Sequence, residues 1–338
     1  MKKNLTSPIA ITMGEPSGIG PEIIIKTWLK KLDPKYKFFV IGNYNFFLKW
    51  KKILNLDIPI KKIIEPDETD NLFSEFLPII DIPFSEDFTI GKPSKANKDS
   101  ILNSIKYGVN YIKNKKCSSI ITCPVQKNIF YGNSFNFPGM TEFLGSLVTE
   151  KCTPTMMLHS SELKIVLMTT HIPLREINST LNTKDIYNKI RIAISYLSNY
   201  FCIKKPNIAV TGLNPHLGEM IEENSEENNI IVPAIKQLIS EGYNVKGPIA
   251  SDSLFYKENR KKFDLVVCMY HDQGLIPIKT IDFWNTVNIT LGLPFLRISP
   301  DHGTALDIAG RGIGNPSSLL QSIKITKQIL ENKNSIHV

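Results

Sequence analysis

The sequence predicts an α/β protein built on mainly parallel sheets with flanking helices. Short apolar runs rich in β-branched residues recur along the 338 residues, and helical patterns separate them. Polar residues follow several of these runs directly. Buried parallel strands give such continuous apolar runs, and an alternation of strand and helix is typical of parallel sheets. A chain of this length is long enough for two domains or for one large α/β unit.

The predicted strands are apolar runs that stop abruptly at glycine or at polar residues: residues 8–13, 37–42, 118–123, 163–170, 207–212 and 264–270. The predicted helices lie between them: from Gly20 to about residue 31, and at residues 99–113, 183–200 and 230–241. The first helix has Pro21 in its first turn, where proline is tolerated, and Glu22, which favours the positive end of the helix dipole. Residues 43–98 are predicted to form short helices and strands in alternation, and they carry little functional signal.

The segment from Phe263 to Pro316 has the strongest functional signal in the chain. An apolar run ends in Tyr270-His271-Asp272-Gln273-Gly274, and open α/β sheets place their ligands at such carboxyl ends of strands. Further along, charged and amide side chains occur among five glycines: Asn288, Arg297, Asp301, His302, Asp307 and Arg311. We interpret this segment as a site, because it is too polar for core and too apolar for a linker.

Composition excludes several classes of function. The net charge is +8, but the 35 lysines greatly outnumber the five arginines and are scattered among Asn and Ile, so no nucleic-acid partner is expected. No apolar run has the length of a membrane span, and the first residues lack the features of a signal peptide. The five cysteines have no C-x-x-C spacing. Together these features predict a cytoplasmic protein with reduced thiols.

Three histidines each follow a predicted strand. His171, His216 and His271 would all face one carboxyl edge of a parallel sheet, so they could form a site for a divalent metal such as zinc. For any one of them, capping or hydrogen bonding is the simpler interpretation. Three such placements in succession favour a metal site.

Two further features each have a functional and a structural interpretation. The run from Gly14 to Gly20 follows a strand and opens a helix, as a phosphate loop does, but it matches neither dinucleotide nor Walker patterns and could be a tight turn. Lys279, Asn288 and Arg297 are polar residues with apolar neighbours. We expect the two cations to bind a carboxylate or a phosphate rather than to extend from strand ends into water. The acidic segment 219–227 is expected to be solvated surface.

Six separate motifs resemble the 4-hydroxythreonine-4-phosphate dehydrogenases, which are NAD-dependent enzymes of pyridoxal-phosphate biosynthesis. They are Gly14-Glu-Pro-Ser-Gly-Ile-Gly-Pro-Glu22, Pro138-Gly-Met-Thr-Glu-Phe143, Thr169-Thr-His-Ile-Pro-Leu174, Gly212-Leu-Asn-Pro-His216, Met269-Tyr-His-Asp-Gln-Gly274 and Val287-Asn-Ile-Thr-Leu-Gly-Leu-Pro294. The segment from His302 to Pro316 is similar to the cofactor loop of isocitrate and isopropylmalate dehydrogenases. The resemblance implies their two-domain fold, with the active site in the interdomain cleft.

The resemblance also implies roles for individual residues. His171, His216 and His271 would bind a divalent metal (zinc, magnesium or cobalt), with one histidine contributed across the interface of a homodimer. Thr141, Lys279, Asn288 and Arg297 would contact the substrate. The adenosine end of NAD, or of NADP as the alternative, would lie against His302, Gly303, Thr304, Ala305 and Asn315. Residues 1–118 with 285–338 would form the cofactor-side domain, and residues 119–284 the metal-binding and dimerisation domain.

The chain departs from the family at one substrate position. The family motif reads Gly-His-Thr-Glu where this chain has Gly139-Met140-Thr141-Glu142, and methionine cannot donate a hydrogen bond. Three functions therefore stay open: the amino-acid dehydrogenase, a dehydrogenase of threonate or erythronate 4-phosphate, and a catalytically silent binding protein. The proton acceptor is Asp272 or Asp252, with Lys279 as a further catalytic candidate.

Overall fold

The structure is a computed structural model that describes residues 7–130, 137, 139–148, 152–219 and 224–336, without the side chains of residue 127 and of residues 334–336. The chain divides into two compact units. Unit 1 comprises residues 1–150 and 294–334, and unit 2 comprises residues 151–293 with the last four residues. The sequence placed the corresponding boundaries at residues 118/119 and 284/285, and the roles assigned to the two parts stay predictions.

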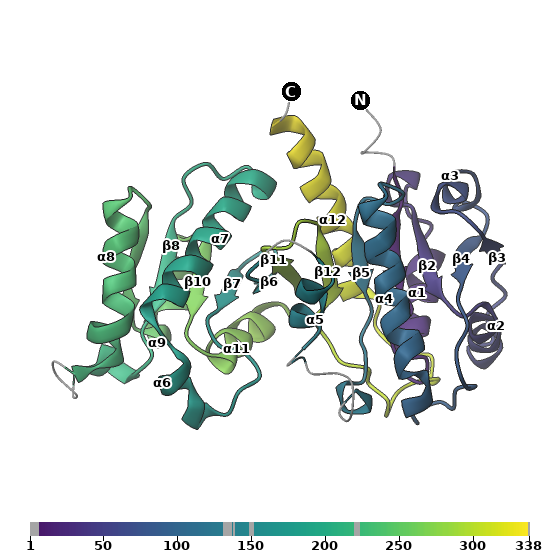
Figure 1. The fold of residues 1–338 in the computed structure, drawn as a ribbon, viewed down its shortest axis with the longest axis horizontal. Helices are drawn as coiled ribbons and strands as arrows, with labels where there is room; N and C mark the ends of the chain where they lie inside the picture. The colour runs from purple at the N-terminus through teal and green to yellow at the C-terminus, as the bar shows by residue number, and fades with distance from the viewer. Residues whose placement is uncertain (1–6, 131–136, 138, 149–151, 220–223, 337–338) are drawn as a thin grey trace. The chain divides into compact units, whose positions relative to one another are not determined.

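Unit 1 contains a parallel sheet (Figure 1). Its strands, in spatial order, are β3 (Ile60–Ile63), β4 (Leu77–Asp81), β2 (Phe38–Gly42), β1 (Ile9–Thr12), β5 (Ile120–Thr122) and β12 (Arg297–Pro300). All neighbouring pairs are parallel. The helices of this unit are α1 (Gly20–Leu29), α2 (Tyr44–Ile53), α3 (Thr69–Leu72), α4 (Lys98–Lys113), α5 (Met140–Ser146) and α12 (Ser317–Ile336), the last of which ends just beyond the unit.

Helix α4 packs on the central strands of unit 1. The core on this side of the sheet contains the fully buried Phe39 and Ile41 of β2, with Tyr111 and Ile112 of α4 packed against it. The periodic apolar positions of α4 predict this contact, because one stripe of an amphipathic helix must be covered.

Unit 2 contains a mixed sheet (Figure 1). Its strands, in spatial order, are β11 (Val287–Leu291), β6 (Thr155–His159), β7 (Lys164–Leu167), β10 (Leu265–Cys268), β8 (Ile208–Thr211) and β9 (Val245–Ile249). The pairs β11–β6 and β6–β7 are antiparallel and the others are parallel. The helices are α6 (Ile177–Thr180), α7 (Thr183–Phe201), α8 (Val232–Ser240), α9 (Ser251–Leu254), α10 (Lys257–Arg260) and α11 (His271–Asp282).

Helix α11 covers β7 and β10, and its Ile278 lies in a core cluster with Leu167, Val266 and Cys268. Burial raises the pKa of the Cys268 thiol, as it does for Cys117 and Cys123. These three cysteines are therefore inert packing residues. None of the described helices has the length and apolar character needed to cross a membrane.

The predicted fold class of mainly parallel sheets with flanking helices is confirmed. The segment that follows Asn285 was predicted to be too polar for core. That prediction is wrong in part, because β11 and β12 are strands in which Ile289 and Ile298 are fully buried. Part of this segment is thus core, with polar side chains interspersed. The acidic segment 219–227 is also not wholly solvated, since Glu227 is buried; residues 220–223 and Pro138 lie outside the described residues.

Candidate functional site

Two of the three predicted histidine ligands lie side by side in unit 2. β7 and β10 run parallel with Leu167 opposite Cys268, so their carboxyl ends lie at one edge of the sheet. His171 follows β7 in a left-handed conformation with φ 35°, and His271 begins α11 directly after β10. Their ring centroids are 5.6 Å apart and the rings are inclined by 45°. The edge of the sheet thus brings two imidazoles together.

His271 is oriented by the residue that follows it. Its Nδ1 lies 2.7 Å from Asp272 Oδ1. In the neutral ring this contact holds the proton on Nδ1 and leaves Nε2 with a lone pair. A carboxylate bound to the other ring nitrogen is the usual partner of a metal-binding histidine. The paired imidazoles therefore have the donor chemistry that a borderline divalent cation requires.

His216 lies in a tight turn that follows β8. The turn Pro215–Gly218 has left-handed backbone at two consecutive non-glycine residues, with φ 51° at His216 and 62° at Leu217. Each such residue costs on the order of 1–2 kcal/mol. Among the residues that the structure describes, no group of three or more His, Cys, Asp or Glu side chains could hold a metal ion. One chain therefore supplies a histidine pair, and the three-histidine site stays a prediction that involves a second copy.

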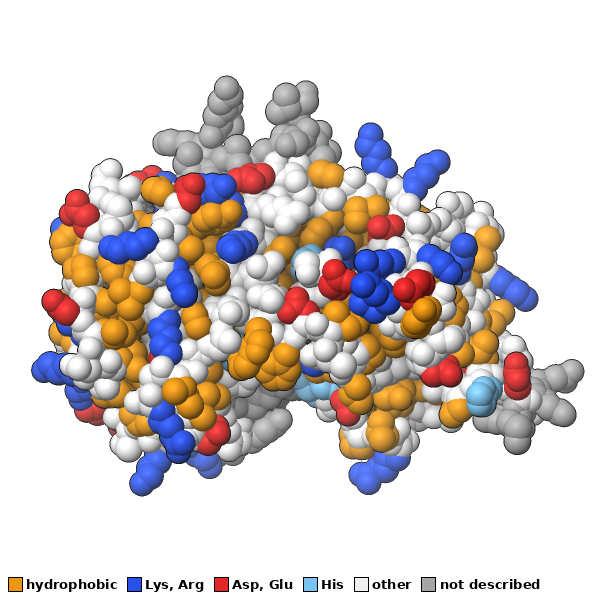
Figure 2. Space-filling view, turned by 180° about the vertical axis from the view of Figure 1, so that it is seen from behind, with side chains coloured by type: hydrophobic (Ala, Val, Ile, Leu, Met, Phe, Trp, Pro, Cys, Tyr) orange, Lys and Arg blue, Asp and Glu red, His pale blue; other side chains and the backbone are white. Residues whose placement is uncertain are grey.

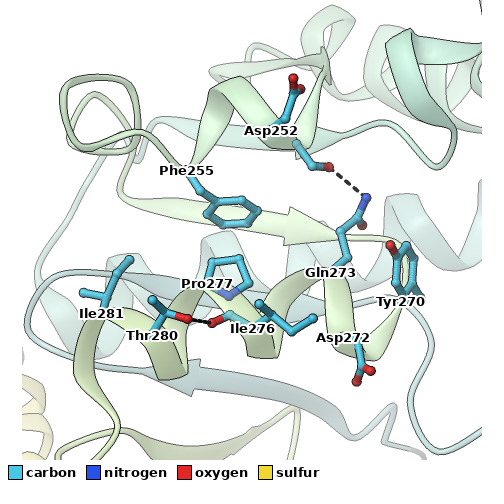
Figure 3. Close-up of a pocket in the computed structure, with 10 residues that line it drawn as sticks. Asp252, Phe255, Tyr270, Asp272, Gln273, Ile276, Pro277, Thr280 and Ile281 are labelled. Carbon is cyan, nitrogen blue, oxygen red and sulfur yellow. Dashed lines mark hydrogen bonds between the residues drawn. The ribbon is translucent and has the colours of Figure 1, made fainter.

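A pocket of about 450 Å³ lies between α9 and α11 (Figure 3). Phe255, Ile276, Pro277 and Ile281 give it an apolar wall. Both proposed proton acceptors line it, but Figure 3 shows the carboxylates of Asp252 and Asp272 pointing away from each other. The structure does not bring them together as one acid–base pair.

The two predicted substrate residues of unit 2 lie on different elements. Lys279 is in the third turn of α11, where its ammonium lies over the ring of Phe283 at 4.9 Å from the centroid. Asn288 is in β11, opposite Leu158 of β6. Its Oδ1 is buried and has no hydrogen-bond partner among the described residues. An unsatisfied buried amide oxygen is costly, and a donor group on a ligand would satisfy it.

The predicted anion-binding arginine of unit 1 is buried. Arg297 begins β12, and its Nε and Nη2 donate to Thr122 Oγ1 at 3.1 and 2.7 Å. Burial lowers the pKa of Arg297 to about 10, and the nearby Glu142 opposes this shift. The guanidinium is thus still charged at neutral pH. Met140 and Thr141 are partly buried in the first turn of α5, the helix that also carries Glu142.

The two glycine-containing loops of unit 1 contact each other. The backbone N–H of Ile19 donates to Thr304 O at 2.9 Å. A Cβ on Gly18 would lie 2.7 Å from the same carbonyl oxygen, so only glycine fits there. Thr304 itself is buried and donates from Oγ1 to Gln126 Oε1 at 2.8 Å. The first loop therefore supports the second, and this contact accounts for Gly18, whereas Gly14 and Gly20 closely approach Pro124 O and Met13 O.

The other predicted cofactor residues lie along the second loop. His302 Nδ1 is 3.0 Å from Gly303 O, and Ala305 has left-handed backbone with φ 45°. Asn315 Oδ1 accepts a hydrogen bond from Ser317 N at 2.9 Å, at the start of α12. All five predicted residues thus belong to one continuous segment that leads into α12, although the side chain of Thr304 faces the protein interior.

A family model described as "Pyridoxal phosphate biosynthetic protein PdxA" matches residues 35–326. The chain belongs to the PdxA family. It is 40% identical over 332 residues to a 4-hydroxythreonine-4-phosphate dehydrogenase of Zymomonas mobilis subsp. mobilis, with 96% of each chain covered. It is 39% identical to the enzyme of the same name from Caulobacter vibrioides, with 95% of this chain and 97% of the relative covered.

Solved structures agree with this family assignment. The 4-hydroxythreonine-4-phosphate dehydrogenase of Klebsiella pneumoniae superposes with a TM-score of 0.83 at 34% identity, covering 96% of this chain and 99% of that one. The isocitrate dehydrogenase of Methylococcus capsulatus superposes with a TM-score of 0.50 at 12% identity, covering 98% and 88%, which shows the fold alone. The predicted resemblance to the PdxA-family dehydrogenases and to the wider fold is confirmed.

Sequence reasoning missed two buried polar residues that shape the site of this PdxA-family chain. Gln273 Oε1 accepts from Met269 N and Thr211 Oγ1, and its Nε2 donates to Gly212 O and Ser251 Oγ, all between 2.7 and 2.9 Å. This fully bonded amide joins the ends of β8 and β10. The only sequence feature that could have indicated this role is the position of Gln273 directly after His271-Asp272.

Glu227 is the second missed residue. Its Oε1 accepts from the backbone N–H groups of Leu213 and Asn214 at 2.8 and 2.7 Å, and Asn214 Nδ2 donates to its Oε2 at 3.1 Å. Burial would raise the pKa of Glu227, but these hydrogen bonds outweigh it and lower the pKa. The charged carboxylate therefore anchors the strained turn that carries His216.

Proposed function

We propose that the protein oxidises 4-phosphohydroxy-L-threonine at C3, with NAD as hydride acceptor. The product is 2-amino-3-oxo-4-phosphooxybutanoate, a β-keto acid that loses carbon dioxide to give 3-amino-2-oxopropyl phosphate. Similarity to dehydrogenases of this name over almost the whole chain supports the reaction. The observation that carries the choice of substrate is the shared name of these relatives. The buried, unsatisfied amide oxygen of Asn288 is compatible with it, because the ammonium group of an amino-acid substrate is a donor.

The substrate carries two anionic groups, and the chain offers two cations for them. Arg297 has a guanidinium that can bind a carboxylate or phosphate bidentately, while Lys279 supplies a compact charge. Thr141 adds a hydroxyl.

Two bound groups complete the proposed enzyme. His171 and His271, with His216 of a second copy, would bind a divalent metal, which supplies a Lewis acid that lowers the pKa of the C3 hydroxyl. Segment 302–305 and Asn315 would bind NAD, with NADP as the alternative; the nicotinamide supplies the hydride acceptor. We further propose a homodimer in the cytoplasm, with active sites shared between subunits.

The proton of the C3 hydroxyl needs an acceptor. Asp272 is 67% exposed and bound to His271, so it orients that ring as well as offering a carboxylate. Asp252 is exposed and lies on the far side of the pocket. The contact with His271 favours Asp272 over Asp252.

The competing function is oxidation of a four-carbon sugar acid phosphate, which has no amine. Met140 favours this alternative, since it replaces the histidine that the family uses at the substrate. The deciding experiment measures NADH formation by the purified protein with zinc or magnesium and NAD. We expect turnover of 4-phosphohydroxy-L-threonine and little of D-threonate or D-erythronate 4-phosphate. The opposite preference would replace the proposed substrate, and no turnover of any of them would favour a silent binding protein.

A further inference from the structure

An ion pair on helix α1 is bonded to the predicted cofactor loop. Glu22 and Lys26 lie one turn apart, and Lys26 Nζ is 2.8 Å from Glu22 Oε1. The Glu22 side chain is fully buried and the Lys26 side chain is 24% exposed. Buried carboxylates are retained where they have specific partners, because an unpaired buried charge is strongly unfavourable.

The partners of this ion pair are backbone groups of residues 312–314. Lys26 Nζ donates to Gly312 O at 2.7 Å and to Gly314 O at 2.8 Å. Glu22 Oε1 accepts from Gly314 N at 2.7 Å. With the contact to Glu22, all three donors of the Lys26 ammonium are used. The ion pair thus forms hydrogen bonds with one N–H and two carbonyl groups of residues 312–314.

This segment has little else in its sequence to define its conformation. Gly310 and Gly312 have left-handed backbone, with φ 78° and 70°, and glycine loses the most conformational freedom on ordering. A Cβ on Gly314 would lie 2.9 Å from Glu22 Oε1, so the close approach depends on glycine. By contrast, α1 is a firm support, since its Ile23, Ile24 and Ile25 are fully buried.

We infer that Glu22 and Lys26 are positioning residues for the dinucleotide cofactor: they fix the backbone of residues 312–314 next to Asn315 before the cofactor binds. Ordering the loop in advance removes an entropic cost from binding, so the pair increases cofactor affinity without touching the reacting atoms. The inference rests on the proposed function for the role of the cofactor. The ordering of the loop itself does not depend on that role.

The test compares Lys26→Met and Lys26→Arg with Lys30→Met, a matched control that removes an exposed lysine at the C-cap of the same helix. In the full-length protein without cofactor, hydrogen exchange of a peptide covering residues 310–316 should be about tenfold faster in Lys26→Met, unchanged in Lys30→Met and intermediate in Lys26→Arg. Unchanged exchange in Lys26→Met, or an equal change in the control, overturns the inference.

The role in cofactor binding is measured in a separate experiment. By calorimetric titration with NAD, Lys26→Met should show a Kd raised about tenfold, with KM for NAD raised equally and kcat within twofold of the parent. Glu22→Gln should show a smaller rise, because it keeps an acceptor for Gly314 N. A lower kcat with unchanged NAD affinity overturns the positioning role. If the parent protein itself binds no NAD, the proposed function fails, whereas the exchange result still decides whether the pair orders the loop.

Discussion

Arg297 donates two hydrogen bonds to a single oxygen, the hydroxyl of Thr122, at 3.1 and 2.7 Å. The two residues are 175 positions apart in the chain and lie on the paired strands β12 and β5. The threonine thus fixes the direction of a fully buried guanidinium that we assign to substrate binding.

Replacing this hydroxyl should weaken substrate binding through Arg297. Thr122→Val keeps the shape of the side chain but leaves two buried donors without their acceptor, which costs about 1–3 kcal/mol of stability. We expect KM for 4-phosphohydroxy-L-threonine to rise several-fold, with KM for NAD unchanged. Thr122→Ser keeps the hydroxyl and should behave as the parent. Steady-state kinetics and thermal unfolding of both variants decide this, and equal KM values for Val and Ser would exclude the orienting role.

Asp272 should control metal affinity through His271. Asp272→Asn removes the carboxylate that holds the proton on His271 Nδ1, and loss of such a partner typically lowers metal affinity about 10–100-fold. Titration calorimetry with zinc measures this directly. Asp282→Asn, at the other end of α11, makes the same change of charge as a control and should have no effect. A Kd for zinc that is identical in both variants would remove Asp272 from the metal site.

His159 should make the protein less stable in mild acid. It stacks on Phe201 with ring centroids 5.3 Å apart, and burial, reinforced by the nearby Lys164, lowers the pKa of His159 to about 3. An unfolded histidine takes up a proton near pH 6.5, whereas the folded one stays neutral until about pH 3. The unfolded state therefore gains about 1.4 kcal/mol per pH unit between these values.

The variant His159→Phe preserves the stacked ring and removes the titrating group. Urea unfolding of the parent should show a free energy of unfolding that falls as the pH decreases below about 6.5. In the variant this dependence on pH should be weaker by about 1.4 kcal/mol per pH unit, the contribution of one proton. A slope that is the same in both proteins would show that His159 is not neutral in the folded state.

Met140 offers a test of substrate choice. Met140→His restores the family residue in the first turn of α5 and adds a hydrogen-bond donor. We expect KM for 4-phosphohydroxy-L-threonine to fall several-fold, with no change in KM for NAD. Turnover of threonate 4-phosphate by the parent, lost on this substitution, would instead indicate that methionine determines specificity for a sugar acid.

Local sequence patterns were sufficient for six of the parallel strands (β1, β2, β5, β7, β8 and β10) and for helices α1, α4, α7 and α8. They did not predict the parallel strands β3, β4 and β9 individually, nor the long helices α11 and α12. The predicted helix at 183–200 is observed at Thr183–Phe201, and the one at 99–113 at Lys98–Lys113. Antiparallel β6 and β11 were not predicted, because the direction of pairing depends on contacts between strands far apart in the chain. The strand character of Arg297–Pro300 was also missed, since a charged residue and a proline at its ends hide four buried positions.

The proximity of His171 and His271 was predictable, because both follow strands that end at one edge of the sheet. The supporting residues were not predictable in the same way. Glu227 lies in an acidic run that suggests a solvated surface, and only the fold shows that it accepts hydrogen bonds from the turn of His216. Periodicity and motif spacing describe neighbours in the chain, whereas such contacts depend on tertiary structure.

The scattered lysines give no reason to revise the expectation about nucleic acids. On the face drawn in Figure 2, the described Lys and Arg side chains are interspersed with acidic and hydrophobic ones rather than gathered in a stripe. Several make ion pairs, including Lys51 with Asp57 and Lys62 with Asp81. That the high lysine content reflects composition rather than a polyanion-binding surface stays a prediction.

The late position of β12 in the chain affects how the protein emerges from the ribosome. Residues 151–293 make up all of unit 2 except its last four residues, and we expect this continuous stretch to fold as soon as it has been synthesised. Unit 1 cannot complete its sheet at that stage. Strand β12 (Arg297–Pro300), which pairs with β5, has not yet been synthesised. During translation the edge of β5 stays open while the whole of unit 2 is made. We therefore expect the nascent chain to depend on chaperones most during this interval, when an unpaired apolar strand is exposed.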